Sequence, residues 1–364
     1  MHRSRLAAVL GALVVLLAGC TTAGTPQAQP SAVAAGPQVP LAQLDILADP
    51  HSYEGPSTAL LADAHVSAPA TPPAQALPAT VTSHDLSGDT SVTVTSTERI
   101  LAMDISGSIA ATVFGLGFGG SVVGRDISTT FPGTEELPVI TSSGHTVNIE
   151  AVLALRPTVL ITDGSVGPVD VVLQLRDAGV AVVFVDTDPT VAGVGDLAVQ
   201  VATALGAPDA GESLAADLEA GIQAKIAEIA AIVPEGEPLR MLFLYLRGTS
   251  GIYYLFGEES GADVLIRSLG GVDVAAEIGL DGMRPMTDEA MVAANPDLIL
   301  VMTDGIASVG GVDGLLESKP AIALTSAGQH RRFVDMADGE ILAFGPRTAD
   351  VLDALARAVY APGR

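Results

Sequence analysis

The chain of 364 residues contains no tryptophan and a single cysteine, Cys20, and only 4% of its residues are aromatic. One cysteine excludes a disulfide framework and a thiolate metal site within the chain. Basic residues are also scarce, since 17 Lys and Arg stand against 42 Asp and Glu, for a formal net charge of −25. This excess of acid argues against nucleic acid, or an anionic membrane surface, as the main partner. An anionic small molecule is not excluded, because locally placed arginines can override the net field.

The sequence also lacks the motifs of common catalytic sites. It has no Ser/His/Asp triad signature, phosphate loop or zincin motif. Gly115-Leu-Gly-Phe-Gly-Gly120 fits G-x-G-x-x-G, but a dinucleotide site needs a strand before the glycines and a helix after them. Here the helical pattern comes first, so a flexible turn is the better interpretation. We therefore expect a binding protein rather than an enzyme.

The N-terminus carries a processing signal. Two arginines precede the apolar run of residues 6–17, which is too short to span a bilayer. The run ends in Leu17-Ala-Gly-Cys20, which resembles a bacterial lipobox. We therefore predict a signal peptide over residues 1–19, lipidation of Cys20, and an extracytoplasmic protein attached to the cell membrane through its lipid only. The alternative is an ordinary signal peptide with an incidental cysteine.

Two stretches near the N-terminus, residues 21–40 and 67–80, are rich in Thr, Ala, Pro and Gln and are typical of extended linker. The segment between them shows no clear periodicity, and we assign it no structure. The predicted organisation is a lipidated N-terminal extension (20–90), an N-terminal lobe (91–206), a bridging helix (207–234) and a C-terminal lobe (235–364).

From Glu98 onward, strand and helix patterns alternate and occur twice. The strand that begins at Arg99 has a counterpart at Arg240, 141 positions later. The acid–helix–proline–strand unit that begins at Glu150 has a counterpart at Glu289, 139 positions later. Two matches in the same order at nearly one spacing indicate a structural duplication.

Between the two halves, residues 210–233 have apolar positions at helical spacing and are bounded by Pro208 and Pro234. A helix of about 20 residues spans about 30 Å, enough to run across two lobes. The fold class is therefore α/β, with two Rossmann-like lobes joined by a long bridging helix. In such sheets ligands bind beyond the carboxyl ends of the strands, where both lobes can face a common cleft.

Tyr245 and Arg247 follow an apolar strand and lie two positions apart, so their side chains share one face. A nearby cation lowers the pKa of a phenol and favours the phenolate. A phenolate oxygen is a hard anionic ligand that suits ferric iron. The alternative for Tyr245 is a core or interface phenol with one hydrogen bond.

His145 lies in a loop of small residues, Ser142 to Thr146, at the expected cleft edge of the N-terminal lobe. An imidazole from this lobe and the Tyr245 phenolate from the other would provide both axial ligands of a haem. The alternative for His145 is a hydrogen-bonding or surface histidine. Arg125 and Arg284 are candidates for binding the haem propionates, although either can be an ordinary surface arginine. A free zinc or manganese site would need three or more converging ligands.

These residues stand in sequence motifs that resemble a known family. The motifs are Leu17-Ala-Gly-Cys20, Val123-Gly-Arg-Asp126, Ser143-Gly-His-Thr-Val-Asn-Ile-Glu150, Leu155-Arg-Pro157 and Tyr245-Leu-Arg247. Over residues 90–364 the chain resembles the hemin-binding substrate-binding lipoproteins of haem ABC importers, the HmuT family of actinobacterial type. The long N-terminal extension departs from the family pattern.

The resemblance implies a class III periplasmic-binding-protein fold and a receptor that carries ferric haem b as cargo to an ABC permease and its ATPase, acting as a monomer without nucleic acid. It implies His145 and Tyr245 as axial ligands, Arg247 as the hydrogen-bonding partner of the tyrosine, and Met302 on the tyrosine side of the haem. Glu150 and Glu289 would contact the permease, or offset the dipoles of their helices. A siderophore- or cobalamin-binding lipoprotein of the same fold is the alternative function.

Overall fold

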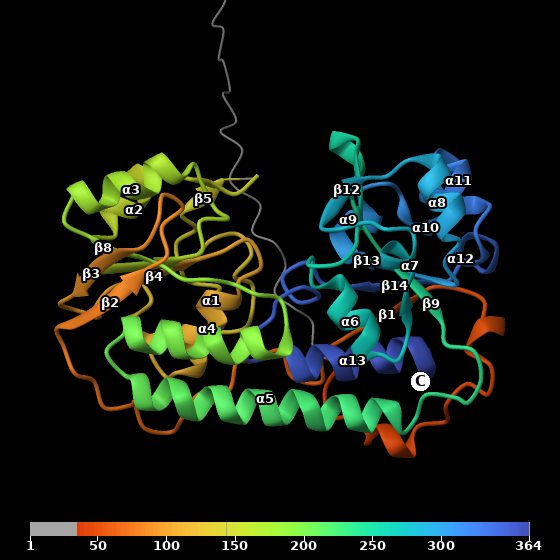
Figure 1. Cartoon of the computed structure of the whole chain (residues 1–364), viewed down its shortest axis with the longest axis horizontal. Helices are drawn as coiled ribbons and strands as arrows, with labels where there is room; N and C mark the ends of the chain where they lie inside the picture. The colour runs from red at the N-terminus through yellow and green to blue at the C-terminus, as the bar shows by residue number, and fades with distance from the viewer. Residues whose placement is uncertain (1–34, 143, 364) are drawn as a thin grey trace, which may run out of the picture.

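The computed structural model describes residues 35–142 and 144–363, so the predicted signal peptide and Cys20 lie outside the described residues. Figure 1 shows two α/β lobes side by side, with the long helix α5 (Pro208–Ala230) running along one side of both. No helix of the described ranges is long and apolar enough to cross a membrane.

The N-terminal lobe contains a parallel sheet in the order β4-β7-β8. Its strands are β4 (Ile100–Met103), β7 (Val159–Thr162) and β8 (Ala181–Phe184), and its helices are α1 (Ser108–Gly115), α2 (Ile149–Ala154), α3 (Val169–Asp177) and α4 (Val191–Ala204). Two hairpins complete the lobe, β2 (Ala79–Ser83) with β3 (Thr90–Val94) and β5 (Thr141–Ser142) with β6 (Thr146–Val147). The residues of β4 and β7 are all buried, as the continuous apolar runs of parallel strands require.

The C-terminal lobe contains a mixed sheet in the order β1-β14-β13-β9-β10-β12, with β11 also paired to β9. Its strands are β1 (Ser57–Thr58), β9 (Arg240–Arg247), β10 (Ile252–Phe256), β11 (Val272–Asp273), β12 (Met283–Pro285), β13 (Leu298–Met302) and β14 (Phe333–Met336). Its helices are α6 (Ala262–Ser268), α7 (Val274–Glu277), α8 (Asp288–Ala294), α9 (Thr303–Ala307), α10 (Gly311–Ser318), α11 (Pro320–Ala323), α12 (Ser326–His330) and α13 (Thr348–Tyr360).

The duplication predicted from the sequence is present in the strand pairing. In the N-terminal lobe β4 and β7 are parallel neighbours, with Ile100 opposite Val159. In the C-terminal lobe β9 and β13 are parallel neighbours, with Met241 opposite Leu298. Met241 follows Ile100 by 141 positions, and Leu298 follows Val159 by 139 positions. These are the offsets that the repeated segments show in the sequence. The two lobes therefore repeat one strand register.

The bridging helix α5 falls within the predicted range of 207–234. It packs against α4 of the N-terminal lobe and against α13 of the C-terminal lobe. Ile222 and Ile229 are fully buried on its inner side. One stiff element therefore contacts both lobes along its length.

The segment of residues 35–78, which we call the strap, is ordered, although the sequence predicted linker at 21–40 and 67–80 and gave no structure to the residues between them. Its strand β1 adds to the C-terminal sheet, pairing in parallel with β14. Leu61 is 1% exposed within the core of that lobe. The buried guanidinium of Arg332 donates hydrogen bonds to the Ser57 hydroxyl and to the carbonyls of Ala358 and Val359. An added strand and a buried leucine thus order residues for which the sequence showed no clear periodicity.

The strap then crosses to the N-terminal lobe. The N–H of Ala76 donates to the carbonyl of Gly206 (2.8 Å), and the Gln75 amide donates to the carbonyl of Leu205 (2.8 Å). The hairpin β2–β3 follows at once, so the N-terminal lobe begins earlier than the predicted position 91. The chain therefore contacts both lobes before it forms the bridging helix.

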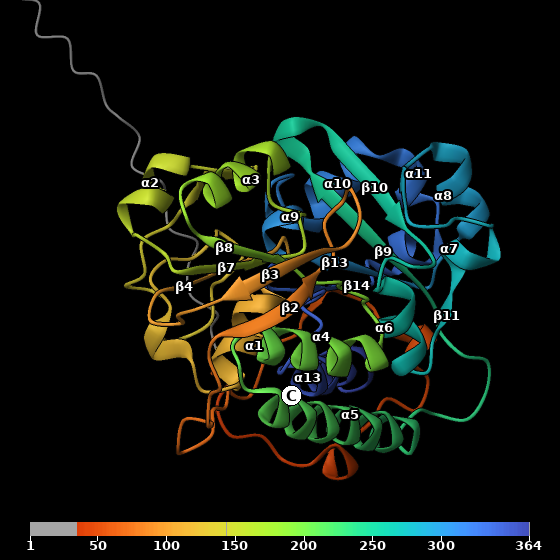
Figure 2. The same cartoon turned by 60° about the vertical axis from the view of Figure 1, so that its left-hand side comes forward.

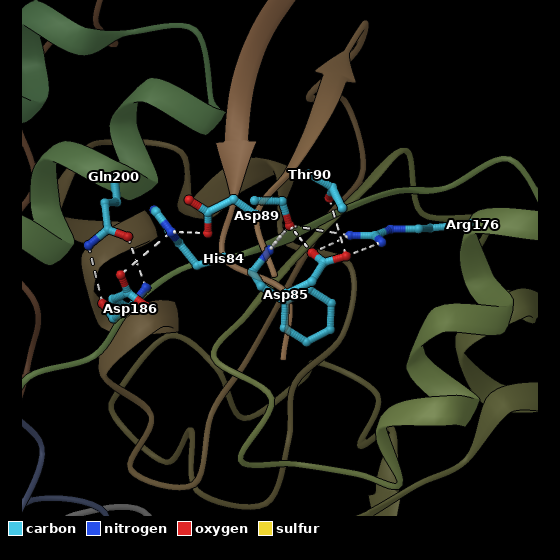
Figure 3. A network of polar contacts seen from close by, with 9 residues as sticks. His84, Asp85, Asp89, Thr90, Arg176, Asp186 and Gln200 are labelled. Atoms are coloured by element: carbon cyan, nitrogen blue, oxygen red, sulfur yellow. Dashed lines mark hydrogen bonds and ion pairs between the residues drawn. The ribbon is translucent and has the colours of Figure 1, made fainter. Parts of the chain in front are cut away.

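A polar network fastens the turn of the β2–β3 hairpin to the lobe (Figure 3). Asp85 accepts hydrogen bonds from both terminal nitrogens of Arg176, at 2.5 and 2.8 Å, and this pairing lowers the pKa of the Asp85 carboxyl. His84 Nδ1 lies 3.1 Å from a carboxylate oxygen of Asp89 and 3.7 Å from one of Asp186. The hairpin is thus an integral part of the N-terminal lobe.

Candidate functional site

His145 stands in the short hairpin turn between β5 and β6, at the loop predicted from the sequence. Its backbone is left-handed (φ 58°), and so is that of Gly144 (φ 90°). The His145 N–H donates to the carbonyl of Ser142, and the His145 carbonyl accepts from Gly167. Two successive left-handed residues turn the chain sharply, which requires glycine at the first of them. The turn therefore fixes the backbone from which the imidazole projects.

The surroundings of the His145 imidazole disfavour its protonation. Burial lowers the pKa of His145, and the positive charge of Arg247 lowers it further. The Nδ1 atom is buried and has no hydrogen-bond partner among the residues that the structure describes. Both effects disfavour protonation of the ring, and a neutral imidazole keeps a nitrogen lone pair available to a metal. His145 stands in the N-terminal lobe, and Arg247 ends strand β9 of the C-terminal lobe.

Tyr245 lies at the carboxyl end of β9, half-buried, with its ring on the same face of the sheet as Phe256. The two rings stack with centroids 5.7 Å apart and an interplanar angle of 18°. The guanidinium carbon of Arg247 lies 4.7 Å from the centre of the Tyr245 ring. The strand therefore places Tyr245 and Arg247 on one face, as its period of two predicts. Within the described ranges the guanidinium lies over the ring, and no hydrogen bond joins it to the hydroxyl.

The other contacts of Arg247 fix its position. Its Nη2 donates to a carboxylate oxygen of Asp338 (2.5 Å) and contacts the sulfur of Met302 (3.7 Å). Asp338 also accepts the backbone N–H of Asp304 (3.0 Å), so both ends of the carboxylate are bound. Asp338 was not singled out in the sequence, because 91 positions separate it from Arg247. Met302 lies beside Arg247, on the same sheet face as Tyr245.

An exposed apolar residue, Ile105, follows β4 at the carboxyl end of the N-terminal sheet. It is 55% exposed, and side-chain hydroxyls bind both of its backbone groups. The Ser165 hydroxyl accepts its N–H at 2.9 Å, and the Ser128 hydroxyl donates to its carbonyl at 2.7 Å. These two hydrogen bonds fix the backbone of Ile105 while its aliphatic side chain is exposed to solvent. No sequence signal distinguishes Ile105 from its buried neighbours in the strand.

Two buried carboxylates support this edge of the sheet. Asp126, from the Val-Gly-Arg-Asp motif, accepts the backbone N–H groups of Asp104, Ser128 and Thr129. Asp104 in turn accepts the N–H groups at the start of α1. Burial raises the pKa of Asp104 to about 7, with a further contribution from Asp126, and raises the pKa of Asp126 to about 6. The motif therefore shapes the loop that presents Ile105.

The two arginines predicted to bind propionates stand elsewhere. Arg125 is 5% exposed, and its Nη1 donates to the backbone carbonyls of Asp126 and Thr129 inside the N-terminal lobe. Arg284 is exposed on the edge strand β12, opposite Leu255. Leu255 belongs to the core on the other side of the sheet from Tyr245. Neither arginine is therefore brought to the face that carries Tyr245.

Glu150 and Glu289 are both exposed, each in the first turn of its helix, α2 and α8. Figures 1 and 2 show α2 on one lobe and α8 on the other, both on the side of the molecule away from α5. The two helices that carry the predicted pair therefore lie on one side of the protein, one on each lobe.

A cavity of about 480 Å³ lies elsewhere, beside α5 where the lobes meet. Its lining includes Val191 of α4, Glu219 of α5 and Arg267 of α6, and neither His145 nor Tyr245. Asp263 pairs with Arg267 there. We assign the candidate site to His145 and Tyr245, because these are metal-ligating groups on different lobes and the cavity offers none that converge.

Comparison with known proteins places the chain in a family. A family model described as periplasmic binding protein matches residues 105–338. The crystal structure of the heme binding protein HmuT is similar with a TM-score of 0.80 and 39% sequence identity, covering 86% of this chain and 99% of that one. None of the curated proteins matches the chain.

Two further heme-binding proteins are similar over a shorter range. The periplasmic protein RhuT from Roseiflexus sp. RS-1 has a TM-score of 0.66 and 39% identity, covering 72% of this chain and 98% of that one. BhuT, solved in complex with two hemes, has a TM-score of 0.62 and 32% identity, covering 72% and 97%. These are binding proteins and not enzymes, as the sequence predicted. The chain belongs to the periplasmic binding protein family, with the two-lobed class III fold.

Proposed function

We propose that this protein is an extracytoplasmic haem receptor of an ABC importer, which carries ferric haem b between its lobes to a permease and performs no reaction itself. Its 39% identity to a heme binding protein over 99% of that protein's length supports the ligand class. The observation that carries the assignment is the arrangement of the two candidate ligands. The guanidinium carbon of Arg247 lies 4.7 Å from the centre of the Tyr245 ring on one lobe, and His145 stands in a turn of the other lobe with a buried Nδ1 atom that has no hydrogen-bond partner among the described residues.

In this proposal His145 and Tyr245 bind the iron from its two sides. A buried neutral imidazole offers a nitrogen lone pair, and a phenol oxygen is a hard ligand suited to ferric iron. The HmuT protein has also been solved as alanine variants of one histidine, one tyrosine and one arginine, with the tyrosine and arginine two positions apart. Tyr245 and Arg247 have this same spacing.

Arg247 packs its guanidinium over the Tyr245 ring, 4.7 Å from its centre, and would hold the ring in place for the iron. Asp338 holds the guanidinium in place, and Met302 packs beside it. Ile105 would add apolar contact from the N-terminal lobe. We propose neither propionate candidate as a haem contact, since Arg125 is bound within its lobe and Arg284 stands opposite Leu255, on the other face of the sheet from Tyr245.

Outside the described residues, we propose that Cys20 carries the lipid anchor and that the protein acts as a monomer. The extracytoplasmic location agrees with the periplasmic binding protein family. Glu150 and Glu289 would be the acidic contacts to the permease and its ATPase, one from each lobe.

Titration of the purified protein with hemin, followed by its absorption spectrum, tests the proposal. Wild type should give a sharp Soret band, and His145→Ala and Tyr245→Ala should each shift or abolish it. Two matched controls, His330→Ala and Tyr253→Ala, should leave the band unchanged, because Tyr253 points to the opposite face of the sheet and packs on Lys319. Unchanged spectra in both ligand variants would refute the ligand assignment. Failure of wild type to bind hemin would favour a siderophore or cobalamin.

A further inference from the structure

The segment of residues 338–347 follows β14 in the C-terminal lobe and packs against the N-terminal lobe. We call it the interlobe segment. At its start Asp338 binds Arg247 of the candidate site. At its end the guanidinium of Arg347 lies over the ring of Phe131 in the N-terminal lobe, with its central carbon 5.3 Å from the ring centre. The segment therefore joins the candidate site in one lobe to the body of the other lobe.

An internal ion pair closes the interlobe segment into a compact loop. Arg347 Nη2 donates to the carbonyl of Gly339 at 3.0 Å, and its Nη1 lies 3.6 Å from a carboxylate oxygen of Glu340. The side chains of Arg347 and Glu340 are each only 4% exposed. Breaking such a buried pair is costly, because one charge is left without compensation away from water. The segment is therefore a firm element between the lobes.

Gly339, the second residue of the segment, approaches the N-terminal lobe closely. A Cβ atom at this position would lie 2.6 Å from the Thr130 hydroxyl oxygen and 2.7 Å from the backbone carbonyl oxygen of Ser128. Ordinary contact begins near 3.4 Å, so at Ser128 one side would have to yield by about 0.7 Å. The backbone of Gly339 is not left-handed. The close approach, and not the backbone conformation, therefore requires a glycine here.

Both sides of this contact are firmly held. The backbone N–H groups of Ser128 and Thr129 donate to Asp126, which is fully buried. A Cβ atom at Gly107, within the same lobe, would lie 3.0 Å from the same Ser128 carbonyl oxygen, so this oxygen has close neighbours in both lobes. On the other side, two hydrogen bonds hold the carboxylate of Asp338. A methyl group at position 339 would therefore separate the lobes rather than deform either one.

The contact also lies beside both halves of the candidate site. The Ser128 hydroxyl donates to the carbonyl of Ile105, the exposed residue at the end of the N-terminal sheet. Asp338, the neighbour of Gly339, holds the arginine that lies over the Tyr245 ring. Metal–ligand distances in proteins stay within about 0.2 Å of their standard values. The spacing of the lobes must therefore be correct if one iron atom is to be bound from both.

We infer that Gly339 is a positioning residue for haem ligation, because the absence of a side chain there lets the lobes approach closely enough for His145 and Tyr245 to bind the same iron. The inference rests on the proposed function and goes beyond it, since it gives a role to a residue that has no side chain to offer the haem. When the lobes are held apart, the anionic phenolate keeps the ferric iron and the neutral imidazole loses it. One added methyl group should thus act as though His145 had been removed.

The test is a double-mutant cycle between Gly339→Ala and His145→Ala, measured by hemin titration and by the absorption spectrum. Gly339→Ala alone should weaken hemin binding about tenfold and shift the Soret band toward that of His145→Ala. In the His145→Ala background the same substitution should have no further effect, since the bond that it weakens is already absent. A residue that contributed only to folding would lower the affinity by the same factor in both backgrounds.

Gly345→Ala is the matched control within the interlobe segment. A Cβ atom there would lie 3.5 Å from the carbonyl oxygen of Ser108 in the N-terminal lobe, which is an ordinary contact, so this variant should bind hemin like wild type. Urea unfolding checks that each variant is folded. Should Gly339→Ala not fold, Thr130→Ile takes its place in the cycle with the same expected result, because it enlarges the other side of the same contact.

Three results would count against the inference. Wild-type affinity and spectrum in Gly339→Ala would overturn the positioning role, and so would equal losses of affinity with and without His145. Wild-type protein that binds no hemin would instead overturn the proposed function, and the inference with it.

Discussion

The guanidinium carbon of Arg247 lies 4.7 Å from the centre of the Tyr245 ring, while its Nη2 is bound to Asp338 at 2.5 Å. One cation is thereby shared between an aromatic face and a largely buried carboxylate. Burial lowers the pKa of His145 on the other lobe, and the same cation lowers it further. Arg247 thus acts electrostatically on both predicted ligands.

Asp338→Asn should loosen Arg247. The variant removes the charge of a partner whose side chain is only 10% exposed, and we expect a loss of about 1–3 kcal/mol in the free energy of unfolding and weaker hemin binding. Urea unfolding and hemin titration measure the two effects. The control is Asp313→Asn, which breaks an exposed pair with Arg331 of the same length and should cost at most about 1 kcal/mol. Equal costs for the two variants would contradict a special role of Asp338.

Hemin binding should weaken in acid as His145 is protonated, because an imidazolium has no lone pair for iron. Burial and the charge of Arg247 both lower the pKa of His145 below its ordinary value of 6.5, so wild type should keep its affinity down to a pH below 6.5. In Arg247→Gln the contribution of charge is lost and that of burial remains, so the pKa of His145 should rise. NMR titration of the His145 ring in the ligand-free protein measures both values. If the pKa of His145 did not rise in Arg247→Gln, the charge of Arg247 would not be a cause of its lowering.

Gly144→Ala should disturb the turn that carries His145. Glycine at this position has a φ of 90°, which an alanine adopts only with strain, although a Cβ atom would meet no neighbour. We expect a loss of about 1 kcal/mol or more in stability and reduced hemin affinity. Gly120→Ala is the control, since a Cβ atom there also meets nothing and the backbone is not left-handed. If both variants bound hemin like wild type, the geometry of the turn would be irrelevant to the ligand.

The strap should contribute to stability, although its central residues show no clear periodicity in the sequence. Leu61→Ala removes a side chain that is 1% exposed in the core of the C-terminal lobe, and we expect it to cost about 2–5 kcal/mol. Its neighbour Leu60 is 39% exposed, and Leu60→Ala should change stability by no more than about 0.5 kcal/mol. Thermal or urea unfolding of both variants distinguishes an integrated strap from a loosely attached one, for which the two changes would be alike and small.

Much of the fold could be read from the sequence, because it depends on local pattern. The period of two placed Tyr245 and Arg247 on one face of β9, the helical spacing between two prolines located α5, and the repeated acid–helix–proline unit revealed the duplicated lobes. Such patterns are local consequences of strand and helix geometry. Alignment of the two units also located Glu150 and Glu289 on equivalent helices.

Other features depend on contacts between distant parts of the chain, and only the tertiary structure decided them. Asp338 is paired with Arg247 because β9 ends, and the loop after β14 begins, at the same edge of the sheet. The strap is ordered because Leu61 is buried in a core formed by residues far along the chain. The strand register places Arg284 on the face of the sheet opposite to Tyr245. Sequence pattern determines which faces are apolar, whereas burial and electrostatic pairing depend on which distant segments meet.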